Sequence, residues 1–198
     1  MEVVALAARE PERDTARGMS QENQRTIAER AGVRWPSMAP RTMQWVLRLP
    51  PGSRMRKAML ERFARNAFLS WNRGDYALVP ILDDPEVEAH FTVRARPAVG
   101  TDDVYYGPDG HCRAMEEWNE AWREWDAEID EVIEEGRDQV LIVARLYGEG
   151  AVSGIRLDDW GAVRYTFREG RILRIDGAID ADRDRVLDAL GATAELRD

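Results

Sequence analysis

The stretch that decides the fold is residues 139–179, which read QVLIVARLYGEGAVSGIRLDDWGAVRYTFREGRILRIDGAI. Its apolar runs are interrupted at Gly148, Gly150 and Gly170, which are typical turn positions. The pattern predicts three successive strands, over residues 139–147, 153–167 and 172–179. A further strand is predicted just before them, over residues 128–133. Because the connections are short, we expect these four strands to be antiparallel neighbours in one sheet.

Amphipathic helices are predicted on the N-terminal side of these strands. Apolar residues recur at three- and four-residue steps between Ser53 and Gly74, as one face of a helix requires. This helix is followed by a short helix over 76–82 and a strand over 87–93. A closing helix is predicted after the strands, over 182–190. The sequence therefore predicts an α+β domain with helices on one face of a curved sheet.

A third helix is predicted after Gly110. We expect Trp118, Trp122 and Trp125 to form one aromatic stripe on it, since they are spaced by four and three residues. His111, near the start of this helix, is expected to be exposed.

The chain divides into an extension, residues 1–52, and a domain, residues 53–198. Prolines bracket the apolar segment 43–49, which predicts a separate strap packed on the domain. A membrane-surface or partner-binding strip is the alternative interpretation of this segment. Residues 1–18 are either a flexible tail or precede the true initiator, Met19.

The formal net charge of −9 is unevenly distributed along the chain. Residues 1–60 carry +5 and residues 61–198 carry −14, and eleven carboxylates face only two arginines between Glu116 and Asp138. Such a surface repels phosphate, so we expect no nucleic-acid partner. The N-terminal strap is expected to lie against the acidic surface of its own chain or of a dimer mate.

The counts of cysteine and histidine exclude other classes of protein. A single cysteine, Cys112, cannot form an internal disulfide. One cysteine and two histidines are too few to assemble the usual zinc ligand sets. No motif indicates another metal or a cofactor. No apolar run is long enough to span a bilayer. We expect a cytoplasmic protein with no membrane partner.

Five segments are similar, in order and spacing, to one known family. They are Phe68-Leu-Ser-Trp-Asn-Arg-Gly-Asp75, Asp84-Pro-Glu-Val-Glu88, Val104-Tyr-Tyr-Gly107, Gly150-Ala-Val-Ser-Gly154 and Tyr165-Thr-Phe-Arg-Glu-Gly-Arg-Ile-Leu-Arg174. Over residues 55–192 the chain resembles the SnoaL-like branch of the nuclear transport factor 2-like superfamily. The resemblance implies a cone-shaped α+β barrel, in which a strongly curved antiparallel sheet wraps around a long helix and encloses an apolar cavity. It also implies a homodimer joined through the outer face of the sheet.

The superfamily includes ketosteroid isomerases, limonene epoxide hydrolases, scytalone dehydratases and polyketide cyclases beside non-catalytic binders, so the fold alone does not settle function. The positions that carry isomerase and epoxide hydrolase chemistry match Ala67, Ala89, Val163 and Gly177. None of these side chains titrates, which disfavours both known chemistries.

Three other residues are candidates for acid–base catalysis. Alternation along the predicted strand places Asp159 and Tyr165 on one face, and the resemblance implies that this face points inward. There Asp159 would act as acid or base and Tyr165 as a hydrogen-bond donor. Their alternative interpretations are a solvated aspartate and a half-buried tyrosine of the sheet. His90 is a candidate proton shuttle, although it points outward if Ala89 points inward.

The resemblance also implies which residues form the apolar wall. Those expected to contact a ligand are Ala67, Trp71, Met115, Trp118, Trp122, Val163 and Gly177. The leading hypothesis is a protein that binds a small apolar or polyketide-like molecule in the cone, with acid–base chemistry of the cyclase, isomerase or hydratase type. The alternative is a non-catalytic dimeric module whose cone is filled by Trp71, Trp118 and Trp122.

Overall fold

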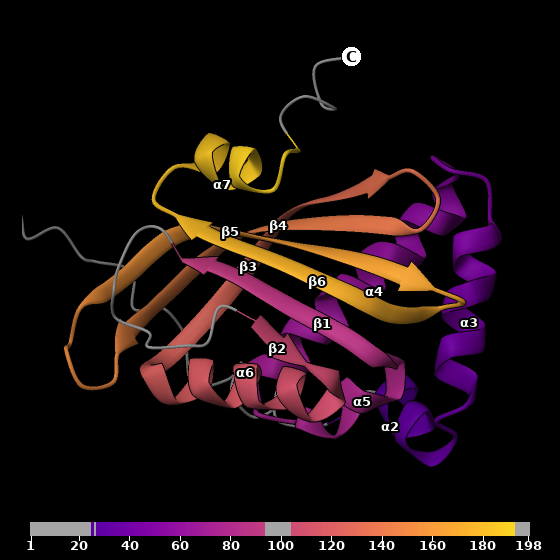
Figure 1. Cartoon of the computed structure of the whole chain (residues 1–198), viewed down its shortest axis with the longest axis horizontal. Coiled ribbons are helices and arrows are strands. Elements are labelled where there is room, and N and C mark those ends of the chain that lie inside the picture. The colour runs from indigo at the N-terminus through magenta and orange to yellow at the C-terminus, as the bar shows by residue number, and fades with distance from the viewer. Residues whose placement is uncertain (1–24, 26, 94–103, 193–198) are drawn as a thin grey trace, which may run out of the picture.

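The computed structural model describes residue 25 and residues 27–93 and 104–192. Residues 1–18 and Met19, for which a tail or a later start is predicted, lie outside the described residues. The N-terminal helices are α2 (Ile27–Arg34), α3 (Met38–Arg48) and α4 (Arg54–Asn72), followed by η1 (Tyr76–Leu78) and α5 (Val79–Leu82). The later helices are α6 (Gly107–Ala121) and α7 (Arg183–Ala189). The strands are β1 (Asp83–Val93), β2 (Val104–Tyr106), β3 (Trp122–Glu135), β4 (Gln139–Gly150), β5 (Arg156–Arg168) and β6 (Arg171–Asp180) (Figure 1).

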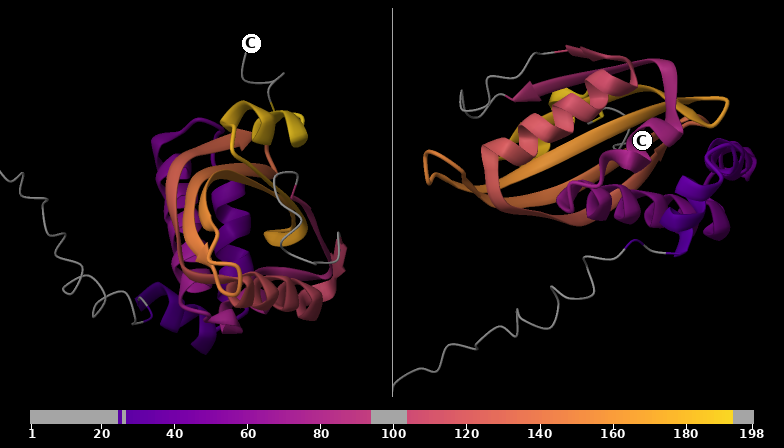
Figure 2. Two further views of the ribbon diagram at one scale, coloured as in Figure 1. Left: turned by 90° about the vertical axis from the view of Figure 1, so that its left-hand side faces the viewer. Right: turned by 90° about the horizontal axis from the view of Figure 1, so that it is seen from below.

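The strands form one sheet in the order β2-β1-β6-β5-β4-β3. The sheet is strongly curved and does not close on itself (Figure 2), which confirms the predicted fold class. Strands β3 to β6 are antiparallel neighbours, as the sequence predicts. The antiparallel sheet that the resemblance implies has one exception, because β1 pairs with β6 in parallel and Ala89 lies opposite Ile175. A parallel pair needs a long connection, and α6 together with β3, β4 and β5 lies between these two strands in the chain.

Helix α4 packs in the concave face of the sheet. The Ser53 hydroxyl caps it by accepting a hydrogen bond from the Arg56 amide at 3.3 Å, an ordinary N-terminal cap. Leu60, Ala64 and Phe68 recur every four residues and are buried in the main core with the inward residues of the strands. The predicted periodicity thus corresponds to the buried stripe of this helix.

The aromatic stripe predicted on one helix is wrong. Helix α6 ends at Ala121, and Trp122 and Trp125 belong to β3. Residues three apart on a regular strand point to opposite faces. Here the pairing of β3 with β4 shifts register between Arg123 and Asp126, and Glu124 has a left-handed φ of 52°. This bulge adds a residue, so both indoles turn inward and lie 5.6 and 5.7 Å from the ring of Trp118.

The segment predicted as a strap is part of helix α3. Pro40 fits there because it lies in the first turn, where the amide has no partner within the helix. Met43, Val46 and Leu47 are buried in the main core. The turn between β5 and β6 lies directly beneath this helix, because a Cβ on Gly170 would collide with the carbonyl oxygen of Pro40.

One buried arginine ties the extension to the sheet. Arg56 has no exposed side-chain surface, and its Nε lies 2.7 Å from Oε2 of Glu134 on β3. Its other nitrogens donate to the carbonyl oxygens of Leu47 (2.7 Å), Leu49 (3.2 Å), Gly136 (3.3 Å) and Arg137 (2.8 Å). Because Arg56 belongs to α4, its ion pair does not test the prediction that the strap lies against the acidic segment 116–138.

Helix α7 covers the convex face of the sheet, opposite α4 and α6 (Figure 1). Asp182 caps it by accepting from the amides of Asp184 and Arg185. A second apolar cluster lies under it, formed by Leu141, Val143, Ala162, Ala178, Val186, Leu187 and Ala192. Part of the outer face, over β4, β5 and β6, is therefore covered by the chain itself. No helix in the described part of the chain is long and apolar enough to cross a membrane.

Candidate functional site

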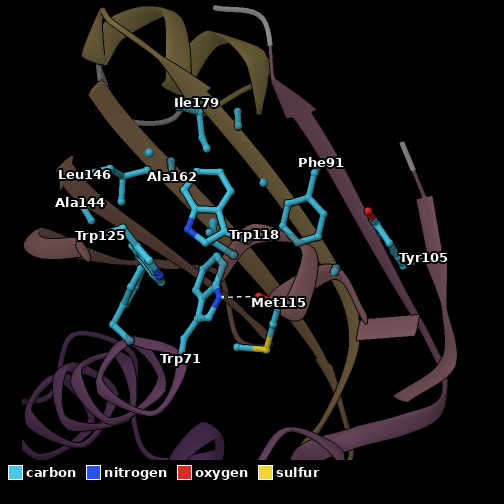
Figure 3. A pocket seen from close by; sticks show the side chains of 16 residues that line it. Trp71, Phe91, Tyr105, Met115, Trp118, Trp125, Ala144, Leu146, Ala162 and Ile179 are labelled. Carbon is cyan, nitrogen blue, oxygen red and sulfur yellow. Dashed lines mark hydrogen bonds between the residues drawn. The ribbon is translucent and has the colours of Figure 1, made fainter. Parts of the chain in front are cut away.

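A small apolar cavity of about 60 Å³ lies inside the cone. Trp71, Trp118 and Trp125 gather on one side of it, and Phe91 lies beyond Trp118 (Figure 3). Trp71 and Trp125 pack edge to face with their centroids 4.7 Å apart. The indole nitrogen of Trp71 donates to the Met115 carbonyl oxygen at 3.4 Å, whereas that of Trp118 is buried with no partner among the described residues.

A larger cavity of about 180 Å³ adjoins the first. Phe68, Trp71 and Met115 line both cavities, so they form a shared wall. The larger cavity has a mixed lining that includes His111 and Tyr165. For comparison, a dry engineered cavity of about 150 Å³ holds benzene. The larger cavity therefore has room for about one ring, and the smaller one for a substituent.

A buried histidine–aspartate pair borders the larger cavity. Nδ1 of His111, on α6, lies 3.0 Å from Oδ2 of Asp83, the first residue of β1. The side chain of Asp83 has no exposed surface, and its other oxygen, Oδ1, has no partner among the described residues. Burial raises the pKa of Asp83, while the hydrogen bond and charge of His111 oppose that rise. An aspartate of this kind orients the imidazole and fixes its tautomer.

Tyr165 of β5 also lines the larger cavity. Its ring packs against Phe63 (5.6 Å) and Phe167 (6.4 Å) in the main core. Burial, and then the charge of Asp83, raise the pKa of Tyr165 far above its ordinary value. The phenol therefore stays protonated and can act only as a neutral hydrogen-bond donor or acceptor.

The N-terminal extension supplies one residue of this lining. Glu29 of α2 lines the larger cavity with its side chain only 3% exposed, and its Oε1 lies 2.6 Å from Nη2 of Arg73. Arg25 pairs with Asp75 beside it, at 2.5 Å. Two ion pairs thus hold the extension against the wall of the cavity.

The structure separates the candidate catalytic residues of the sequence. Asp159 is buried on the inward face of β5 but lines neither cavity. It lies six residues from Tyr165 on the same strand, a distance of about 20 Å. These two side chains cannot contact the same small molecule.

His90 lies on the other face of the sheet. Ala89 and Phe91, its neighbours on β1, pack in the inward core, so alternation turns His90 outward. There its Nε2 lies 3.0 Å from Oε2 of Glu88. His90 therefore does not meet Tyr165 or the cavities.

The residues expected to contact a ligand fall into three groups. Trp71 and Met115 line both cavities; Trp118, Val163 and Gly177 line only the smaller one; Ala67 lines only the larger one. Trp122 is buried behind Trp118 and lines neither cavity.

Sequence reasoning missed the pair of His111 and Asp83. His111 was expected to be exposed, but only 8% of its surface is. Helix α6 begins at Gly107, four residues earlier than expected, so His111 lies within the helix. Its spacing of four and seven residues from Met115 and Trp118 is the signal that places it on the buried face.

The SnoaL-like domain family model matches residues 60–175, more than half of the chain. The chain belongs to the SnoaL-like domain family. This match contains most of the cavity lining described above, including Trp71, His111 and Tyr165. Among curated proteins, none matches the chain.

Solved structures share the fold at low identity. A structure of Bal32a from a soil-derived mobile gene cassette is 17% identical with a TM-score of 0.53, covering 67% of this chain and 96% of that one. A putative SnoaL-like polyketide cyclase from Jannaschia is 15% identical with a TM-score of 0.52, covering 69% and 92%. A nuclear transport factor 2-like protein of unknown function from Burkholderia pseudomallei is 17% identical with a TM-score of 0.53, covering 67% and 97%. These similarities establish the cone fold, but a shared fold at this identity does not identify a ligand.

Proposed function

We propose that this SnoaL-like protein binds a small apolar molecule in the two adjoining cavities of its cone. The observation that carries the proposal is the pair of neighbouring cavities, one with room for a ring and one with room for a substituent, which share Phe68, Trp71 and Met115 as lining residues. Apolar cavities lined by aromatic side chains with a few polar groups are the usual form of small-molecule sites. The ligand class is a compound of one ring, or of a compact fused pair of rings.

The polar groups of the cavities define the ligand further. The unpartnered indole nitrogen of Trp118 is a donor, and a buried donor without a partner costs free energy until an acceptor arrives. A ligand with an oxygen acceptor on its ring system would supply that partner. The proposal therefore favours a ketone, ester or phenol over a pure hydrocarbon.

Titration with acetophenone, followed by tryptophan fluorescence, tests the proposal. Saturable quenching is expected, since Trp71 and Trp118 line the cavities. Ala67→Phe fills the larger cavity and should weaken binding at least tenfold. Ala58→Phe is the matched control, because Ala58 is exposed on the same helix.

The alternative, a filled cone that binds nothing, predicts the opposite results. Fluorescence would then change only linearly with added acetophenone. Ala67→Phe and Ala58→Phe would then be indistinguishable in the same titration. Either result would remove the proposed function.

A further inference from the structure

Two polar groups in the larger cavity are not used by the protein itself. His111 engages Asp83 through Nδ1, and no hydrogen bond of its Nε2 is found among the described residues. The hydroxyl of Tyr165 likewise has no hydrogen-bond partner within the described part of the chain, although its ring is buried. Both side chains line the same cavity.

The pairing with Asp83 decides what His111 can do. When Asp83 is ionised its carboxylate only accepts hydrogen bonds, so in the neutral form of the His111 ring Nδ1 carries the proton and Nε2 keeps its lone pair. Asp83 is itself held in place, because Arg171 donates to its backbone carbonyl oxygen at 3.0 Å. The result is an oriented base on a residue that lines the larger cavity, in the arrangement that a buried aspartate gives a catalytic histidine.

We propose that His111, oriented by Asp83, is the general base of this cavity, and that the Tyr165 hydroxyl donates to the substrate oxygen that gains negative charge. The inference rests on the proposed function, since the substrate is the small ring compound bound there. These residues lie at none of the four positions, Ala67, Ala89, Val163 and Gly177, that match the catalytic positions of the isomerases and epoxide hydrolases.

The substrate class follows from the two groups. It is a compact ring compound in which an acidic C–H bond is conjugated to an oxygen. Nε2 takes the proton, the C–H electron pair forms a new π bond, and a displaced electron pair moves to the oxygen. Tyr165 stabilises that oxyanion, and no oxidant or reductant takes part. Asp83 touches no substrate and is a positioning residue.

The probe for this step is 5-nitrobenzisoxazole. A base removes its ring C–H proton, the C–H electron pair completes a nitrile, and the N–O bond breaks with its electron pair on oxygen. The product is the coloured 2-cyano-4-nitrophenolate. General-base catalysis contributes at least about 100-fold, so His111→Gln should lower kcat/KM for this reaction by about that factor.

The other histidine of the chain provides the matched control. His90→Gln removes an imidazole from the outer face and should leave the rate unchanged. Tyr165→Phe should lower kcat at least about tenfold. Asp83→Asn should lower kcat by a similar factor or more while KM is retained, because it disturbs the tautomer of His111.

Two measurements keep the inference falsifiable if a variant folds poorly. Circular dichroism checks the fold of each substituted chain, and His111→Asn is a second variant at the same position in case His111→Gln does not fold. In the intact wild-type chain, ¹⁵N NMR of the histidine rings should show the Nδ1-protonated tautomer for His111, and the opposite tautomer would overturn the inference.

The closing experiment measures binding and turnover of the same probe by calorimetry and absorbance. If the wild-type chain binds 5-nitrobenzisoxazole but converts it no faster than His111→Gln does, the inference is overturned and the proposed function stands. A probe that neither binds nor reacts overturns the inference, and the proposed function falls with it only if acetophenone also fails to bind.

Discussion

Nδ1 of His111 lies 3.0 Å from Oδ2 of Asp83, a carboxylate with no exposed side-chain surface. This contact joins the second turn of α6 to the first residue of β1. It places the two titratable groups at the point where the helix, the sheet and the larger cavity meet. A buried charge in such a position makes stability depend on pH.

The first prediction concerns Asp83→Asn and pH. Burial is the largest cause of the raised pKa of Asp83. A carboxyl whose pKa is raised on folding binds more protons in the folded state, so its contribution is fully present at low pH and is lost as pH rises through the folded pKa. Wild type should therefore lose stability relative to Asp83→Asn as the pH rises from about 4 to about 7.

Urea unfolding of both chains at the two pH values measures this difference. Asn is the appropriate replacement because it preserves the shape of the side chain and cannot titrate. A difference in unfolding free energy that is constant with pH, or that changes in the opposite direction, would contradict the prediction.

The second prediction concerns Gly177, which lines the smaller cavity. A Cβ at this position would lie 2.5 Å from Cδ1 of Phe91, so the ring must move. Gly177→Ala should cost about 1–3 kcal/mol through overpacking and weaken acetophenone binding severalfold. Gly32→Ala is the control, since a Cβ there meets only Leu78 at 3.9 Å. Equal affinities of the two variants would show that the smaller cavity takes no part in binding.

The fold could be predicted from the sequence where one local rule determines the element. The apolar stripe that includes Leu60 and Phe68 specifies α4. The turn glycines between the last strands specify the antiparallel hairpins. The parallel pairing of β1 with β6 could not be predicted, because it depends on the path of the chain between them rather than on either strand's pattern.

The site could be predicted only in part for the same reason. The apolar wall follows from the helix period and the resemblance. The pair of His111 and Asp83 does not, because it joins residues 28 positions apart from elements whose starts were each predicted a few residues late. Element boundaries are the weakest part of sequence reasoning, and here they decided whether a histidine is exposed or buried.

The third prediction concerns the bulge that turns two indoles inward. Glu124 has a φ of 52°, which costs an L-residue about 1–2 kcal/mol. Glu124→Gly should therefore leave the melting temperature unchanged or raise it by a few degrees. Glu128→Gly, on the regular part of the same strand, should lower stability by about 0.5–1 kcal/mol. If both substitutions lower the melting temperature equally, the bulge carries no backbone strain.

The fourth prediction concerns Arg56, which joins the extension to the sheet. Arg56→Met leaves Glu134 without its ion-pair partner at a side chain that is 15% exposed, and it removes the arginine donor from four carbonyl oxygens. Removing one partner of a buried pair typically costs about 3–5 kcal/mol.

Urea unfolding of Arg56→Met and Arg54→Met measures this contribution, because Arg54 is exposed in the same first turn of α4. Arg54→Met should change stability by less than about 0.5 kcal/mol. Since Arg56 is fully buried, added salt should screen its interaction far less than that of an exposed pair. The gap between the two variants should therefore persist at high ionic strength. A gap that disappears in salt would mean that the N-terminal part is held to the sheet by surface charge, rather than by this buried contact.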